Sequence, residues 1–177
     1  YIVRAFQYYM KTEVVFGAGA ESQTAALVQK HGGSRVLVVY GGGSAVRSGL
    51  LDRICGQLKA AGIAYETFGG VQPNPRLSLV REGIAICRKE QIQLVLAVGG
   101  GSAIDTAKAI VNGACYDGDV WDLYEGKGSN DTALPLGVVL TIPAAGSEMS
   151  RSSVITREED WCKRGRNAYT NFPTFSI

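Results

Sequence analysis

Residues 95–105 read Val-Leu-Ala-Val-Gly-Gly-Gly-Ser-Ala-Ile-Asp. The run from Leu94 to Val98 is short, apolar and rich in branched residues, which indicates a buried β-strand. Three glycines follow, and residues 103–111 then have helical composition, with Ser102 as the expected N-cap. At such a turn the first amides of the helix lack partners, so the backbone can bind an anion. The stretch therefore predicts a phosphate-bearing ligand, against the alternative of a plain tight turn.

The same pattern occurs twice in the chain. Residues 36–45 read VLVVYGGGSA and residues 94–103 read LVLAVGGGSA, 58 residues later. Neither copy contains the dinucleotide motif G-x-G-x-x-G or the phosphate-loop motif G-x-x-x-x-G-K-[ST]. Parallel strands end at the same edge of a sheet, so the two turns are expected to flank one extended ligand. The alternative remains that both are only tight turns.

The rest of the chain alternates between strand and helix patterns. Strands are expected at 35–40, 64–68, 137–142 and 152–156, helices at 20–30, 46–61 and 76–90, and a polar loop at 157–166. Two short runs, 6–9 and 13–16, predict an N-terminal β-hairpin. We therefore expect one α/β domain over residues 1–177, with a Rossmann-like, mostly parallel sheet, helices on both faces, and that hairpin in front.

Composition excludes several classes of function. The chain has 177 residues, is 46% hydrophobic and carries a net charge of +2, which predicts a buried core and neither a nucleic-acid nor a membrane partner. The four cysteines are far apart without a C-x-x-C pair, so we expect reduced thiols and a cytoplasmic setting. The single histidine, His31, precedes two glycines and is interpreted as a helix ending rather than a ligand.

Six segments in order resemble the iron-containing (group III) alcohol dehydrogenases, particularly the butanol-dehydrogenase-like branch. They are YMKTEVVFGAG (9–19), VVYGGGSAVRSG (38–49), FGGVQPNP (68–75), LAVGGGSAIDTAK (96–108), LTIPAAGSE (140–148) and residues 154–156. The resemblance implies a Rossmann-like amino-terminal domain that binds NAD(P). It also implies a helical carboxyl-terminal domain that holds a divalent metal, usually iron and sometimes zinc, with the alcohol or aldehyde between the two domains.

The resemblance assigns cofactor-binding roles to residues of this chain. It places the pyrophosphate on the main glycine turn, the adenosine half near the loop after residue 72, and further contacts at the ends of later strands. The first glycine turn falls where the family chooses between NAD and NADP; it contains no Asp, and Arg47 is near, which favours NADP(H) over NAD(H). Asp105 is either a cofactor contact or a stabiliser of the first helical turn. The full set is Gly42, Gly43, Ser44, Pro73, Asn74, Gly99, Gly100, Gly101, Ser102, Asp105, Thr141, Ile142, Ala145, Ser147 and Lys163.

No metal or catalytic residue is predicted within the chain, because one histidine and scattered carboxylates cannot assemble such a site. We expect the chain to be the cofactor domain alone, a truncated part of the enzyme from which the helical metal-binding domain is absent. It would then bind NAD(P)H but turn over little by itself. The full-length enzyme, expected to be a homodimer, would transfer hydride between a small alcohol or aldehyde and the nicotinamide.

Two other functions remain open from the sequence. Dehydroquinate synthase and glycerol dehydrogenase share the glycine turn followed by an acid, although the Pro73-Asn74-Pro75 loop favours the butanol-type branch. The other alternative is a binding module without chemistry, for which an exposed apolar face would be evidence.

Overall fold

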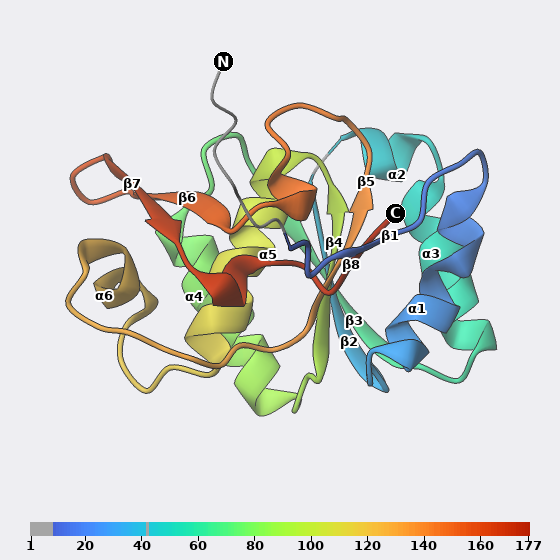
Figure 1. The fold of residues 1–177 in the computed structure, drawn as a ribbon, viewed down its shortest axis with the longest axis horizontal. Helices are drawn as coiled ribbons and strands as arrows, with labels where there is room; N and C mark the ends of the chain where they lie inside the picture. The colour runs from blue at the N-terminus through green and yellow to red at the C-terminus, as the bar shows by residue number, and fades with distance from the viewer. Residues whose placement is uncertain (1–8, 42) are drawn as a thin grey trace, which may run out of the picture.

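The computed structural model describes residues 9–41 and 43–177, which form a six-stranded parallel sheet between two layers of helices (Figure 1). The sheet order is β1-β8-β5-β4-β2-β3. Its strands are β1 (Glu13–Val14), β2 (Arg35–Gly41), β3 (Ala64–Val71), β4 (Leu94–Gly99), β5 (Leu136–Leu140) and β8 (Phe175–Ser176). The α/β class and the mostly parallel sheet expected from the sequence are confirmed.

Helices cover both faces because each buried strand presents alternate side chains to opposite sides. The helices are α1 (Thr24–Lys30), α2 (Ser44–Arg47), α3 (Leu50–Ala60), α4 (Leu77–Lys89), α5 (Gly101–Ala114) and α6 (Val120–Glu125), with 3-10 turns η1 (Ala20–Gln23), η2 (Ser147–Met149) and η3 (Tyr169–Asn171). Leu37 and Val39 of β2 pack with α4, α5 and α6, whereas Val36 and Val38 pack with α1 and α3. Figure 1 shows these two groups of helices on opposite sides of the sheet.

The strand order reverses direction between β2 and β4. From β2 the chain crosses to β3 on one side, and it then returns to add β4, β5 and β8 on the other. In open parallel sheets, ligands bind at the carboxyl ends of the strands where the order reverses. The two glycine turns follow β2 and β4, so the repeated sequence occupies both sides of this point.

Three local predictions were wrong. The helix after β4 begins at Gly101 with Gly100 as its N-cap, so Ser102 lies inside the helix and is not the cap. The expected polar loop contains β7 (Cys162–Asn167), which pairs antiparallel with β6 (Ser152–Arg157) in a separate hairpin. The helix expected over 46–61 is divided into α2 and α3 at Gly49, whose φ of 69° ends one helix and begins the next.

The predicted N-terminal hairpin is only partly covered by the described residues. Its first run, 6–9, lies outside them apart from Tyr9. Its second run forms β1, which pairs in parallel with β8 through Glu13 and Phe175.

Candidate functional site

The two glycine turns lie side by side at the carboxyl edge of the sheet. Tyr40 and Val98 are register partners on neighbouring strands, one residue before each strand's terminal glycine. Gly99 has a φ of 154°, which favours glycine, and an added Cβ there would lie 2.9 Å from the Cβ of Ala103. This packing brings the start of α5 close against the end of β4. The structure thus brings Gly99, Gly100, Gly101 and Ser102 together beside Gly43 and Ser44, as predicted; Gly42 lies outside the described residues.

The backbone at the start of α5 is accessible. An added Cβ at Gly100 or at Gly101 would meet no atom within 4 Å, so open space lies above both residues. The first amides of the helix have no partner within the helix itself. Open space beside unpaired amides at a helix N-terminus is the arrangement that accepts a phosphate group.

Arg47 closes the neighbouring turn. A Cβ built on Gly43 would lie 3.2 Å from one guanidinium nitrogen of Arg47, which therefore lies over the turn. This places a positive charge next to the turn where the resemblance expects the choice between NAD and NADP.

The segment after β5 forms a second wall of the site. The amide of Thr141 donates to the carbonyl of Gly99 at 3.1 Å, which ties this wall to the main glycine turn. The Thr141 hydroxyl is buried without a hydrogen-bond partner, so it is free to bind a ligand. Ile142 and Ala145 are exposed on the same segment. The hydroxyl of Ser147, in contrast, is already bound within the protein.

Asp105 binds this second wall rather than the first turn of its helix. It is the fifth residue of α5, and the first turn contains no acidic residue, so the first-turn explanation is wrong. Its carboxylate accepts from the Ser147 hydroxyl at 2.6 Å and from the Val154 amide at 3.1 Å. Burial raises the pKa of Asp105, while these hydrogen bonds and the nearby charge of Lys108 oppose that rise. A direct contact between Asp105 and a cofactor stays a prediction.

Lys108 is a buried charged residue beside the site that was not among the predicted site residues. Its side chain is fully buried, and its ammonium donates to carbonyl oxygens of Ser147, Ser150 and Ser152. Its place in the sequence contained a signal, because a lysine four residues after Ile104 lies on the buried face of an apolar helix.

Asn74 and Lys163 meet at another side of the site. The Lys163 ammonium donates to the Asn74 side-chain oxygen at 2.7 Å, and Pro73 is exposed in the same loop after β3. Behind the pair lies a cavity of 220 Å³ that Arg76, Thr156 and Trp161 also line. One guanidinium nitrogen of Arg76 and the hydroxyl of Thr156 are buried there without partners. Arg76 and Thr156 were not predicted as site residues. They become neighbours in the fold, where the Thr156 amide donates to the carbonyl of Pro75.

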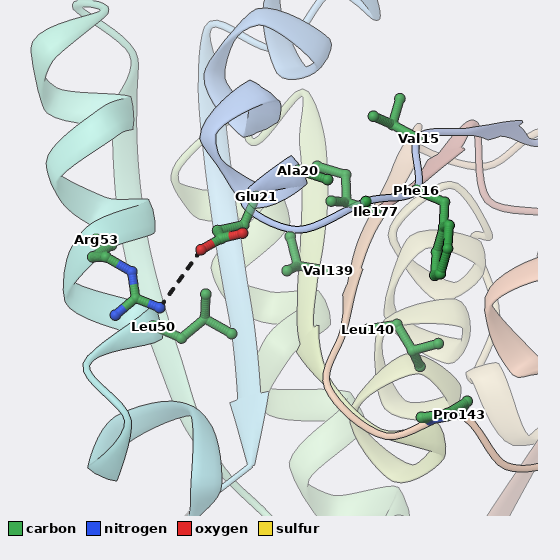
Figure 2. A pocket seen from close by; sticks show the side chains of 11 residues that line it. Val15, Phe16, Ala20, Glu21, Leu50, Arg53, Val139, Leu140, Pro143 and Ile177 are labelled. Carbon is green, nitrogen blue, oxygen red and sulfur yellow. Dashed lines mark ion pairs between the residues drawn. The ribbon is translucent and has the colours of Figure 1, made fainter.

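An apolar cavity of 420 Å³ opens near the end of β5 (Figure 2). Val139, Leu140 and Ile177 line one side, while Glu21 and Arg53 form an ion pair at 3.7 Å. Phe16 borders this cavity and is 99% exposed. None of the residues predicted to bind a cofactor lines this cavity, although Pro143 of the segment after β5 does.

The described residues do not fit a metal ion. Across residues 9–41 and 43–177, no group of three or more His, Cys, Asp or Glu side chains lies close enough to hold one. His31 contacts Glu13 at 3.1 Å and stacks on Phe175 at the amino edge of the sheet, opposite the glycine turns. It immediately follows α1, which agrees with its interpretation as a helix ending.

Two further expectations bear on the surroundings of the site. The described cysteines, Cys55, Cys87, Cys115 and Cys162, are all free thiols. None of the helices in the described part of the chain has the length and apolar character needed to cross a membrane.

Comparison with known proteins identifies related sequences and structures. The family model described as iron-containing alcohol dehydrogenase matches residues 11–177. "Probable NADH-dependent butanol dehydrogenase 1" of Bacillus subtilis is 48% identical over 172 residues, which cover 97% of this chain and 44% of that protein. The NADPH-dependent aldehyde reductase YqhD of Escherichia coli is 33% identical over 175 residues, covering 97% of this chain and 44% of that protein.

A solved structure has the same fold. The crystal structure of NADH-dependent butanol dehydrogenase A from Thermotoga maritima aligns with a TM-score of 0.94 at 41% identity. The alignment covers 98% of this chain and 44% of that one. The chain therefore spans less than half the length of these relatives.

Proposed function

The chain belongs to the iron-containing alcohol dehydrogenase family, and on that basis we propose that it is the NAD(P)-binding domain of a metal-dependent alcohol dehydrogenase or aldehyde reductase. The reaction proposed for the whole protein is hydride transfer between a small alcohol or aldehyde and the nicotinamide ring. The names of the relatives, which refer to butanol and aldehydes, support this substrate class.

The observation that carries the proposal is the pair of glycine turns at the point where the strand order reverses. One turn offers unpaired helix amides beneath open space, which suits the pyrophosphate. The other lies on the neighbouring strand, where the adenosine half of an extended dinucleotide would reach it. A plain tight turn needs neither the open space above Gly100 nor a second copy alongside.

The remaining residues would bind and orient the nucleotide. The unpartnered hydroxyl of Thr141 is available to the cofactor beside the glycine turn. Lys163, held by Asn74, is placed to donate to a ribose hydroxyl, and the exposed Ile142 offers an apolar surface. When bound, the nicotinamide supplies the atom that accepts or donates the hydride.

We propose no metal ligand among the residues of this chain. The described residues contain no cluster of metal-ligand side chains, so we propose that the groups polarising the substrate oxygen lie outside residues 1–177. On this proposal the chain alone binds the nucleotide and turns over little substrate.

A titration tests the proposal most directly. NADH and NADPH are titrated separately into the purified chain in a calorimeter, and saturable binding of at least one is expected. Gly100→Leu places a side chain in the open space above the turn, without strain because Gly100 has an extended backbone, and should abolish binding.

Gly56→Leu is the matched control for this substitution. Gly56 lies in α3, and an added Cβ there also meets no atom within 4 Å, but it is remote from the glycine turns. This variant should bind as the unchanged chain does. Absence of binding to either nucleotide, or equal binding by both variants, contradicts the proposal.

A further inference from the structure

Three backbone carbonyls of one segment bind the ammonium of Lys108. Its ammonium lies 2.7 Å from the carbonyl oxygens of Ser147 and Ser152 and 3.0 Å from that of Ser150. An ammonium has three N–H donors, so these three carbonyls match its capacity. The hydroxyls of Ser147 and Ser150 lie at 3.2 and 3.4 Å and complete the surroundings.

Asp105, one turn earlier on α5, binds the same segment. Its carboxylate accepts from the Ser147 hydroxyl and from the Val154 amide, while Lys108 donates to the carbonyls between them. Side chains three residues apart on a helix lie on one face, so Asp105 and Lys108 both bind residues 147–154. The segment thereby becomes attached to the helix whose N-terminus forms the glycine turn.

This attachment bears on the position of one wall of the proposed cofactor site. At one end, the Thr141 amide is fixed to Gly99. At the other end, residues 147–152 are fixed to Lys108, and the intervening residues 142–145 are exposed. The wall that carries Thr141, Ile142 and Ala145 is therefore attached at both ends, to Gly99 at one end and to Lys108 at the other.

We propose that Lys108 is a positioning residue for nucleotide binding: its charged ammonium holds residues 147–152 so that the 141–147 wall faces the glycine turn. The inference rests on the proposed function only in identifying that wall as a nucleotide contact. Lys108 itself is fully buried.

The charge on Lys108 makes this role distinguishable from ordinary core packing. Burial lowers the pKa of Lys108 to about 8, and the negative charges of Asp105 on α5 and Glu148 on η2 oppose that change. Lys163 on β7 also faces Asp105, and Tyr124 on α6 bonds to Ser153 within the gripped segment. Between pH 8 and the ordinary value of 10.5, the unfolded chain therefore binds more protons at this position than the folded chain does.

The same linkage applies to the local attachment. When residues 147–152 open away from Lys108, its amino group is solvated and its pKa returns toward 10.5, so the open state binds more protons than the closed state between pH 8 and 10.5. The closed attachment therefore becomes more favourable as the pH rises from about 8 to 10.5. A side chain that only fills the core has no ionisable group and gives no such pH dependence.

Hydrogen exchange at residues 150–154 and the dissociation constant of NADH are measured at pH 7 and pH 9.5. Protection factors remove the intrinsic dependence of exchange on pH. For the unchanged chain we expect protection to rise and the NADH dissociation constant to fall, each by about tenfold, from pH 7 to pH 9.5. Lys108→Met, which has no amino group to bind the carbonyls, should show lower protection and a higher dissociation constant at both pH values. Lys108→Arg, which stays charged throughout, should lose the pH dependence of both readouts.

Leu58→Ala is the control for general destabilisation, because Leu58 is fully buried in α3 and belongs to the other face of the sheet. It should lower the melting temperature and leave the pH dependence of both readouts unchanged. The inference is overturned if Lys108→Met keeps the protection and affinity of the unchanged chain. If NADH does not bind while protection still depends on Lys108 and pH, the proposed function fails and the positioning of the segment stands.

Discussion

The Lys163 ammonium lies 2.7 Å from the side-chain oxygen of Asn74 and joins two segments that are 89 residues apart in the sequence. Lys163 belongs to the β6–β7 hairpin, and Asn74 belongs to the loop between β3 and α4. Asn74 adopts a φ of 59°, a left-handed conformation that asparagine tolerates better than most residues. The contact fixes the position of a positive charge that would otherwise move freely on an exposed side chain.

Lys163→Met is expected to weaken NADH binding by about tenfold, because the charged group proposed to donate to the cofactor is lost. The melting temperature should change little, since the contact between Lys163 and Asn74 is exposed. Lys89→Met is the control, because Lys89 is a highly exposed lysine at the end of α4. Calorimetry measures both variants, and equal binding by the two would remove Lys163 from the site.

Arg47 should determine the preference between the two nucleotides. Its guanidinium lies over the first glycine turn, where it can bind the 2′-phosphate that NADPH has and NADH lacks. We expect Arg47→Ala to weaken NADPH binding by about tenfold and to leave NADH binding almost unchanged. Arg53→Ala, which removes the partner of Glu21, serves as the control. A parallel loss of both affinities would contradict this role.

Gly137→Ala tests the packing between neighbouring strands. An added Cβ on Gly137 of β5 would overlap the ring of Phe175, a fully buried residue of the adjacent strand β8. We expect a loss of about 1–3 kcal/mol in the free energy of unfolding, measured by urea denaturation. Gly56→Ala in the open face of α3 should instead raise that free energy by roughly 0.5–1 kcal/mol. If Gly137→Ala leaves the free energy of unfolding unchanged, the Phe175 ring moves to make room for the added Cβ.

The tip of the β6–β7 hairpin should resist acid. Two bonds at 3.0 and 2.6 Å join the Arg157 guanidinium to the Asp160 carboxylate. This pairing lowers the pKa of Asp160 from 3.8 to about 2, so its contribution is present above pH 3.8 and is lost as the pH falls through about 2. In an NMR titration of the carboxyl carbon, Arg157→Ala should move the midpoint back toward 3.8. Arg81→Ala, which removes a partner of Asp119, should leave it unchanged.

The strands of the sheet could be predicted because the pattern that marks each strand lies within a few consecutive residues. The β4 run is apolar at every position and fully buried, and the glycines after it mark the turn in the sequence itself. The repeated GGGSA predicted two equivalent turns, and the structure places them on neighbouring strands. The error at Ser102 was a shift of two positions, because the helix begins within the glycine run, with Gly100 as its N-cap.

The less predictable features depend on contacts between distant residues. The strand over 162–167 reads Cys-Lys-Arg-Gly-Arg-Asn, which has no apolar alternation, and it forms because β6 pairs with it. Lys108 meets Ser147 from 39 residues away, and nothing near the lysine indicates these acceptors. The bond from the Ser147 hydroxyl to Asp105 was likewise not predicted, and a contact between Ser147 and a cofactor stays a prediction.

The pairing of β1 with β8 affects the order in which the chain folds during synthesis. Glu13 is the register partner of Phe175, and the Thr12 hydroxyl donates to the carbonyl of Pro173, 161 residues further along. Strands β2 to β5 and the helices between them need no residue beyond Leu140 to pair with one another, so they are available to assemble first on the ribosome. The edge of the sheet must wait for residue 175, so β1 is synthesised before β2 to β5 but can pair with β8 only after them.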